Sequence, residues 1–148
     1  MKVLIICSST EHGNTQKLAD AMAEELDAEV VTPGAVDPAI LGDFELIGFG
    51  SGIRFGRHYR DLLDMVDGLP PQQDKKSFIF STSGFGWRWW HSTLRRRLVG
   101  QGFEIRAEFC CKGLDTMGLF GLFGGMNKGR PGKNDLEQGR AFARSLLE

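Results

Sequence analysis

The sequence predicts an α/β protein of three layers, in which a doubly wound five-stranded parallel sheet lies between two layers of helices. Short apolar runs alternate with stretches whose apolar residues recur every three or four positions, as strands and helices do. The runs at 2–7 and 44–50 are apolar almost throughout, which is typical of strands covered on both faces. Loops rich in Ser, Thr and Gly follow three of the runs, and such sheets bind ligands at the carboxyl ends of their strands.

The elements follow from the pattern in chain order. We expect strands over residues 2–7, 28–32, 44–50, 76–83 and 103–110. Helices are expected from Thr15, near Asp37, over 57–66, over 89–100 and from an N-cap at Asn134. Alternating strands and helices predict parallel strands joined by right-handed crossovers.

The last strand and the last helix each carry a more detailed prediction. Strict alternation over 103–110 predicts that the four residues Phe103, Ile105, Ala107 and Phe109 face one way, and that Glu104, Arg106 and Glu108 face the other. Spacing in the last helix predicts that Leu136, Ala143 and Leu147 face inward.

Length and composition place the chain in an ordinary class. With 148 residues, 41% apolar and 25% charged, residues 1–148 are expected to form one domain without a membrane span. The apolar start is too short for a secretory signal, and the three cysteines have no metal spacing, so we expect reduced, structural thiols and a cytoplasmic location.

Charge is unevenly distributed along the chain. Residues 1–75 contain six Lys and Arg against 13 Asp and Glu, whereas residues 76–148 contain 12 against six. Because the basic residues do not follow one obvious groove-reading element, we expect no nucleic-acid partner.

The first loop, SSTEHGNT at 8–15, leads from a buried strand into a helix. Helix N-termini attract anions through unpaired amides and the helix dipole, and the hydroxyls here add further donors. The loop has no Lys for a triphosphate and its Mg²⁺, so it suits one terminal phosphate monoester. The alternative is an ordinary capped helix turn.

Three stretches together resemble the flavodoxin-like family. SSTEHGNT is similar to its phosphate loop, DFELIGFGSGI to the third strand and the loop against the inner flavin face, and FIFSTSGFG to the fourth strand and the loop at the flavin edge. NKGRP, near the C-terminal end, is similar to the ending of short members. The resemblance spans the chain and implies an FMN-binding protein with strand order 2-1-3-4-5.

The resemblance also implies a set of cofactor-binding residues. The phosphate would be held by Ser9, Thr10, His12, Gly13, Asn14 and Thr15. The flavin ring would meet Ser51, Gly52, Ile53, Thr82, Ser83, Gly84 and Gly86. An aromatic residue stacks on the ring in many relatives, and the candidates are Phe55, Phe85, Trp87 and Trp89. No catalytic or metal-binding residue is predicted.

The charge of this chain differs from that of acidic flavodoxins. Several of its basic, aromatic and histidine residues are expected to be structural. The chain is close to neutral, and the two presumed ring loops contain Arg54, Arg57 and Arg88. We expect Arg95–Arg97 on a solvated helix face, Trp90 in the core, and no role for His58 or His91. The Gly-rich segment 112–133 could cover the site, join a dimer or wrap the fold.

Three functions remain open at this point. The favoured one is an electron-transfer protein that binds FMN and shuttles one or two electrons between redox partner proteins. The second is an FMN-dependent oxidoreductase acting on a quinone, NAD(P)H or a porphyrinogen, with a small-molecule oxidant or reductant as its partner. The third is a scaffold without flavin, which the Gly-Asn-Thr loop argues against.

Overall fold

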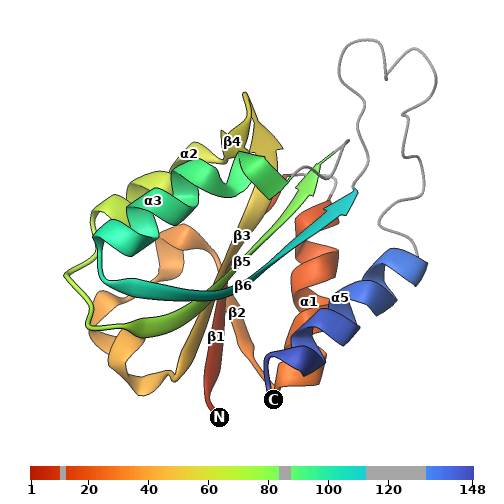
Figure 1. Cartoon of the computed structure of the whole chain (residues 1–148), viewed down its shortest axis with the longest axis horizontal. Coiled ribbons are helices and arrows are strands. Elements are labelled where there is room, and N and C mark those ends of the chain that lie inside the picture. The colour runs from red at the N-terminus through yellow and green to blue at the C-terminus, as the bar shows by residue number, and fades with distance from the viewer. Residues whose placement is uncertain (11–12, 84–87, 113–132) are drawn as a thin grey trace.

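A central sheet between two helical layers forms the computed structural model, which describes residues 1–10, 13–83, 88–112 and 133–148 (Figure 1). The parallel strands are β1 (Val3–Ser8), β2 (Glu29–Val31), β3 (Leu46–Arg54), β5 (Lys75–Ser83) and β6 (Phe103–Lys112), and β4 (Arg57–His58) pairs antiparallel with β3. The sheet order is β2-β1-β3-β5-β6. The predicted 2-1-3-4-5 order is therefore confirmed, since β4 only extends the end of β3.

Helices cover both faces of the sheet. The α-helices are α1 (Asn14–Leu26), α2 (Arg60–Asp67), α3 (Ser92–Gly100) and α5 (Lys133–Ser145), and the 3-10 helices are η1 (Pro33–Ala35), η2 (Pro38–Asp43) and η3 (Arg88–His91). Figure 1 shows α1 and α5 on one face, α2 and α3 on the other, and both termini at the amino edge of the sheet. None of the helices in the described ranges is long and apolar enough to cross a membrane.

Alternating side chains divide the core into two clusters, one under each helical layer. In β1, Leu4 and Ile6 belong to the cluster under α2 and α3, whereas Val3, Ile5 and Cys7 belong to the cluster under α1 and α5. Both clusters are buried, as expected for a parallel strand covered on both faces. The continuous apolar run of β1 thus reflects helices on both faces of the sheet, as predicted.

A hairpin lies where the sequence pattern predicts a helix. β3 continues to Arg54, turns through Phe55 and Gly56, and pairs back along β4, so α2 begins only at Arg60. The two turn residues have φ of 54° and 76°, the left-handed pair that tight hairpins require. The prediction of a helix over 57–66 is wrong at its first three positions, because cross-strand pairing with Ile53 and Arg54 replaces the first helical turn.

A bulge in β6 overturns the predicted alternation. Ser77 pairs with Ile105 and Phe78 with Ala107, so Arg106 is an extra residue. An extra residue reverses which face the following side chains point to. Phe103 and Ile105 accordingly pack under α3, whereas Phe109 packs in the opposite cluster. The prediction that all four apolar residues face one way is therefore wrong.

The C-terminal helix also differs in detail from its prediction. It begins at Lys133, one residue before the predicted Asn134 N-cap. Ala143 is buried and Leu136 packs on the core, as predicted. Leu147 is 49% exposed, so its predicted inward position is wrong. The helix ends at Ser145, and Leu146 packs on the core in its place.

Candidate functional site

The carboxyl ends of three strands lie side by side at one edge of the sheet. Ser8 of β1 is in register with Ser51 of β3, and Gly52 of β3 is in register with Thr82 of β5. The loops after these strands therefore start from adjacent positions, as parallel pairing dictates. The structure brings together the loops that the sequence predicts to form one site.

The loop after β1 prepares the start of α1. Gly13 adopts φ 67°, and its N–H donates to the Thr10 carbonyl oxygen at 2.9 Å. The Ser9 hydroxyl accepts the Gln16 N–H at 3.3 Å. The N-cap residue Gly13 has no side chain to cap the helix, and the first turn has no acidic residue. Amide donors and the positive end of the helix dipole thus face this loop, which suits an anion.

A pair of hydroxyls joins the first loop to the third strand end. The Oγ1 atoms of Thr15 and Thr82 are 2.7 Å apart, and both side chains are buried. A hydroxyl can donate and accept at the same time. Thr15 can therefore accept from Thr82 and still donate to a ligand at the α1 N-terminus.

The second loop is organised around Tyr59. The Ser51 hydroxyl donates to the Gly52 carbonyl at 2.6 Å and accepts the Tyr59 N–H at 3.0 Å. A Cβ on Gly52 would clash with the Tyr59 hydroxyl group, so glycine at this position makes room for the tyrosine. Burial raises the pKa of Tyr59, while a hydrogen bond with Thr10 opposes that rise. Tyr59 thus links the first two loops, a role that the sequence did not predict because position 59 lies within the helix expected over 57–66.

An acidic residue of α2 binds the last residue of β1. The Ser8 hydroxyl lies 2.7 and 2.8 Å from the two carboxylate oxygens of Asp61.

Burial, with smaller effects from Asp20 and Asp61, raises the pKa of Cys7 to about 12. The Cys7 thiol is therefore protonated near neutral pH, in agreement with the structural role predicted for it.

The predicted cofactor residues fall into three groups. The structure brings together Ser9, Thr10, Gly13, Asn14, Thr15, Ser51, Gly52, Ile53, Thr82 and Ser83 around the three strand ends. Phe55 lies at the hairpin tip and is 89% exposed. His12, Gly84, Phe85, Gly86 and Trp87 lie outside the described residues, as does most of the Gly-rich segment 112–133.

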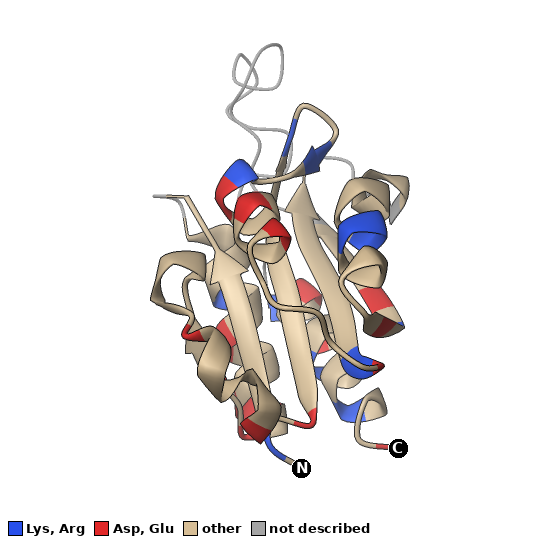
Figure 2. Cartoon of the chain, turned by 90° about the vertical axis from the view of Figure 1, so that its left-hand side faces the viewer, with Lys and Arg blue, Asp and Glu red and all other residues tan. Residues whose placement is uncertain are grey.

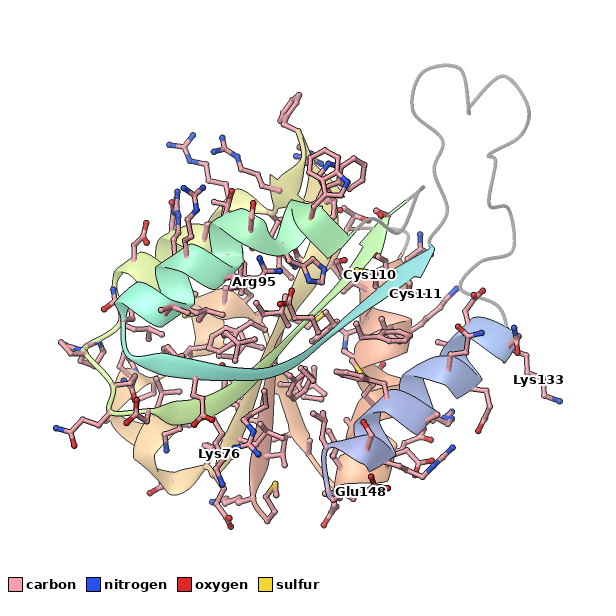
Figure 3. All side chains as sticks on the ribbon, in the orientation of Figure 1. Lys76, Arg95, Cys110, Cys111, Lys133 and Glu148 are labelled. Carbon is pink, nitrogen blue, oxygen red and sulfur yellow. The ribbon has the colours of Figure 1, made fainter. Side chains whose placement is uncertain are left out.

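A titratable network lies on the other side of β5, under α3. The Ser81 hydroxyl is 2.6 Å from His91 Nε2, and His91 Nδ1 is 2.8 Å from Glu108 Oε1. Arg95 donates twice to the same carboxylate, at 2.7 and 2.6 Å. Figure 3 labels Arg95 on α3 and Cys110 on the neighbouring strand β6. The Cys110 sulfur is 3.5 Å from His91 Nε2.

Two buried imidazoles meet in this network. His58 Nε2 donates to the Phe80 carbonyl at 3.0 Å, and the ring centroids of His58 and His91 are 4.9 Å apart. No described residue offers a hydrogen-bond partner to His58 Nδ1. Burial, and then the neighbouring His91, lower the pKa of His58 to about 3. Burial would raise the pKa of Glu108, but the hydrogen bonds from Arg95 and His91 outweigh it and lower that pKa.

The network differs from two sequence interpretations. His58 and His91 make buried hydrogen bonds, and Arg95 pairs with Glu108, whereas Arg96 is exposed as expected. Trp90 is only partly buried. Ser81, His91 and Glu108 are ordered like a hydrolase triad, but Ser81 is 1% exposed, so its hydroxyl cannot reach a substrate in this arrangement. A missed signal was Glu108, a charged residue between the apolar residues Ala107 and Phe109.

The fold is that of a doubly wound α/β protein in which the loops after β1, β3 and β5 meet at one edge of the sheet. The chain belongs to the flavodoxin-domain family, whose model matches residues 5–126. It is 45% identical over 150 residues to an uncharacterized protein of Methanocaldococcus jannaschii, covering 100% of this chain and 99% of that protein.

Solved structures show the same fold at low sequence identity. A flavodoxin of Streptococcus pneumoniae TIGR4 superposes with a TM-score of 0.70 at 16% identity, covering 99% of this chain and 98% of that one. Flavodoxin 2 of Bacillus cereus gives a TM-score of 0.68 at 20% identity, covering 99% and 98%.

Proposed function

We propose that the chain binds FMN at the three strand ends and transfers electrons between redox partner proteins. The observation that carries the proposal is the hydroxyl pair of Thr15 and Thr82, which holds the start of α1 against the end of β5. This contact supports the proposal because it holds the N-terminus of α1, where a helix attracts anions, beside the strand ends of β3 and β5. Bound FMN would supply one- and two-electron redox chemistry, and the protein supplies binding and orientation.

The donor set suits a phosphate monoester. The N-cap residue of α1 is a glycine without a capping side chain, and Ser9, Thr10 and Thr15 add neutral hydroxyls. Neutral donors satisfy a dianion without the cost of burying fixed positive charges. Ser9, Thr10, His12, Gly13, Asn14 and Thr15 would hold the phosphate.

The other two loops would hold the flavin ring. Ser51, Gly52 and Ile53 follow one strand end, and Thr82, Ser83, Gly84 and Gly86 follow the other. Their main-chain groups can pair the polar edge of the ring, which otherwise would be buried unsatisfied. Phe55, Phe85, Trp87 and Trp89 are the candidates for an aromatic contact.

An electron carrier is favoured over an oxidoreductase by the state of the reactive side chains. The Ser81 hydroxyl and both imidazoles of the titratable network are buried, and the Cys7 thiol is buried and protonated. None of these groups can take a proton from, or attack, a bound substrate without a rearrangement. The residues near the site therefore bind and orient, which is the task of a carrier.

Reconstitution of the purified protein with FMN, FAD and riboflavin tests the proposal. Flavin absorbance and fluorescence quenching should show FMN binding more tightly than riboflavin, because only FMN has the phosphate. FAD should bind no better than FMN. Two separable one-electron steps in a reductive titration support a carrier. Failure to bind FMN contradicts the proposal, and steady turnover of NAD(P)H with a quinone favours the oxidoreductase instead.

A further inference from the structure

A basic and aromatic surface lies beside the proposed flavin site. We call it the hairpin face and define it by Phe55, Arg57, Trp89, Thr93, Arg96 and Arg97. The hairpin strand β4 packs against both η3 and α3, so these residues come from adjoining elements. Arg57, Thr93, Arg96 and Arg97 line a hollow of about 390 Å³.

Among the arginines of the hairpin face, Arg97 is paired with an acidic residue of α2, whereas Arg57 and Arg96 are not. Figure 2 shows the basic hairpin β3–β4 at the top of that view and the acidic residues of α2 below it. Those of α2 are engaged: Asp61 binds Ser8, Asp64 pairs with Arg60 at 3.6 Å, and Asp67 pairs with Arg97 at 2.7 Å.

Two arginines of the hairpin face are available to a partner. Arg57 and Arg96 are exposed and have no acidic partner among the described residues. Unpaired guanidinium groups around one hollow attract carboxylates and can bind them in a two-pronged fashion. The hollow therefore suits an acidic group that comes from outside the chain.

Exposed aromatic side chains extend the hairpin face beyond the hollow. Phe55 is 89% exposed and Trp89 is 65% exposed. Phe55 also has φ 54°, a left-handed conformation that is unfavourable for a bulky residue. Such strain persists where the surrounding structure holds it and is common at binding sites. Aromatic residues and arginine are the residue types enriched at the centres of protein interfaces.

We propose that the hairpin face docks a small acidic redox protein, an inference that rests on the proposed electron-transfer function. A small anion in the hollow would leave both aromatic side chains uncovered, because neither lines it. A protein with a carboxylate-rich surface would cover the arginines and the aromatic residues together. The position fits electron transfer, since β3 leads from Ile53 of the proposed flavin site directly into the hairpin.

Titration of the ¹⁵N-labelled protein with an acidic [2Fe–2S] ferredoxin tests the inference. Amide signals of Phe55, Arg57 and Arg96 and the indole signal of Trp89 should shift or broaden. Raising the ionic strength from about 0.05 to 0.5 M should weaken binding roughly tenfold or more, because exposed charges are screened. Arg57→Glu and Arg96→Glu should each weaken it roughly fivefold, and Phe55→Ser should also weaken it.

Lys76→Glu is the matched control, since it makes the same charge change at the start of β5, which Figure 3 labels far from the hairpin. It should leave the dissociation constant within about twofold, as a distant screened charge does. The inference is overturned if all variants bind alike, if the shifts lie elsewhere, or if pyrophosphate binds the hollow and ferredoxin does not. FMN affinity, measured by absorbance on the same variants, reports separately on the proposed function, because the titration does not depend on flavin.

Discussion

Ser81 and Thr82 are neighbours on β5 and point to opposite faces of the sheet, where they meet opposite chemistries. Thr82 shares a 2.7 Å hydrogen bond with the neutral Thr15 at the start of α1. Ser81 is 2.6 Å from His91, which leads to the Glu108–Arg95 ion pair under α3. One strand end thus separates a neutral side at the start of α1 from a titratable side under α3, and the hydroxyls on both sides are buried.

The α1 side of the sheet and the α3 side therefore have different roles. On the α1 side, hydroxyls and amides can bind an anion without changing their own charge. On the α3 side, each charged group is satisfied inside the protein, and breaking one contact leaves another buried polar group unpaired. We therefore expect changes on the α3 side to alter stability and changes on the α1 side to alter ligand affinity.

The largest effect is expected from removing the acid of the titratable side. Glu108→Ala leaves the His91 Nδ1–H and the Arg95 guanidinium without their partner. The free energy of unfolding should fall by about 3 kcal/mol, as when one member of a buried pair is lost. Urea denaturation followed by circular dichroism measures it. A loss below about 1 kcal/mol would mean that the network contributes little.

Acid should act on the same side with a smaller effect. His58 has a pKa of about 3 in the fold against an ordinary value of 6.5, so the unfolded chain binds its proton first as pH falls. Stability is therefore lost below pH 6.5, by about 2 kcal/mol at pH 5. Glu108, whose pKa is lowered, adds a loss only below its ordinary value of 4.5.

Denaturation of the wild type and His58→Phe between pH 7 and pH 5 checks this assignment. His91 and Glu108 are the titratable groups that influence His58 besides its own backbone contact. The variant should lose most of the slope in this range, because its ring does not titrate. An unchanged slope would assign the acid sensitivity to another group.

On the α1 side the expected effect is on affinity. Thr15→Val should weaken FMN about tenfold, which is about 1.4 kcal/mol, through loss of a hydroxyl that donates to a charged group. Thr82→Val is the matched control, since it breaks the same hydroxyl pair but removes no predicted phosphate donor. Fluorescence titration compares the two. Equal losses would show that the hydroxyl pair acts only by holding α1 in place.

The smallest effect is expected for an exposed acid on the same strand as Glu108. Glu104 lies 3.3 Å from Arg106, and both side chains are about half exposed. Glu104→Ala should change the free energy of unfolding by no more than about 0.5 kcal/mol, as is usual for surface pairs. A change as large as that of Glu108→Ala would mean that burial does not determine how much each acid contributes to the free energy of unfolding.

Much of the fold was open to prediction from local pattern. Apolar periodicity located every parallel strand, and loop composition indicated the three strand ends that meet at the site. These features depend on neighbours in sequence, such as alternation along a strand and a Gly-Asn-Thr turn before a helix. The errors at Arg57–His58 and along β6 arise where pairing with another strand overrides such patterns.

Apolar periodicity predicts the parallel sheet, the resemblance adds its strand order, and the loop at 8–15 offers neutral donors that suit one phosphate. Packing between distant residues forms the network of Ser81, His91, Glu108 and Arg95, and it places Tyr59 between two loops. The bulge at Arg106 turns Glu108 inward, which no local pattern announces. The physical reason is that a charge becomes tolerable in a core only when distant residues pair it, and those distances are set by packing.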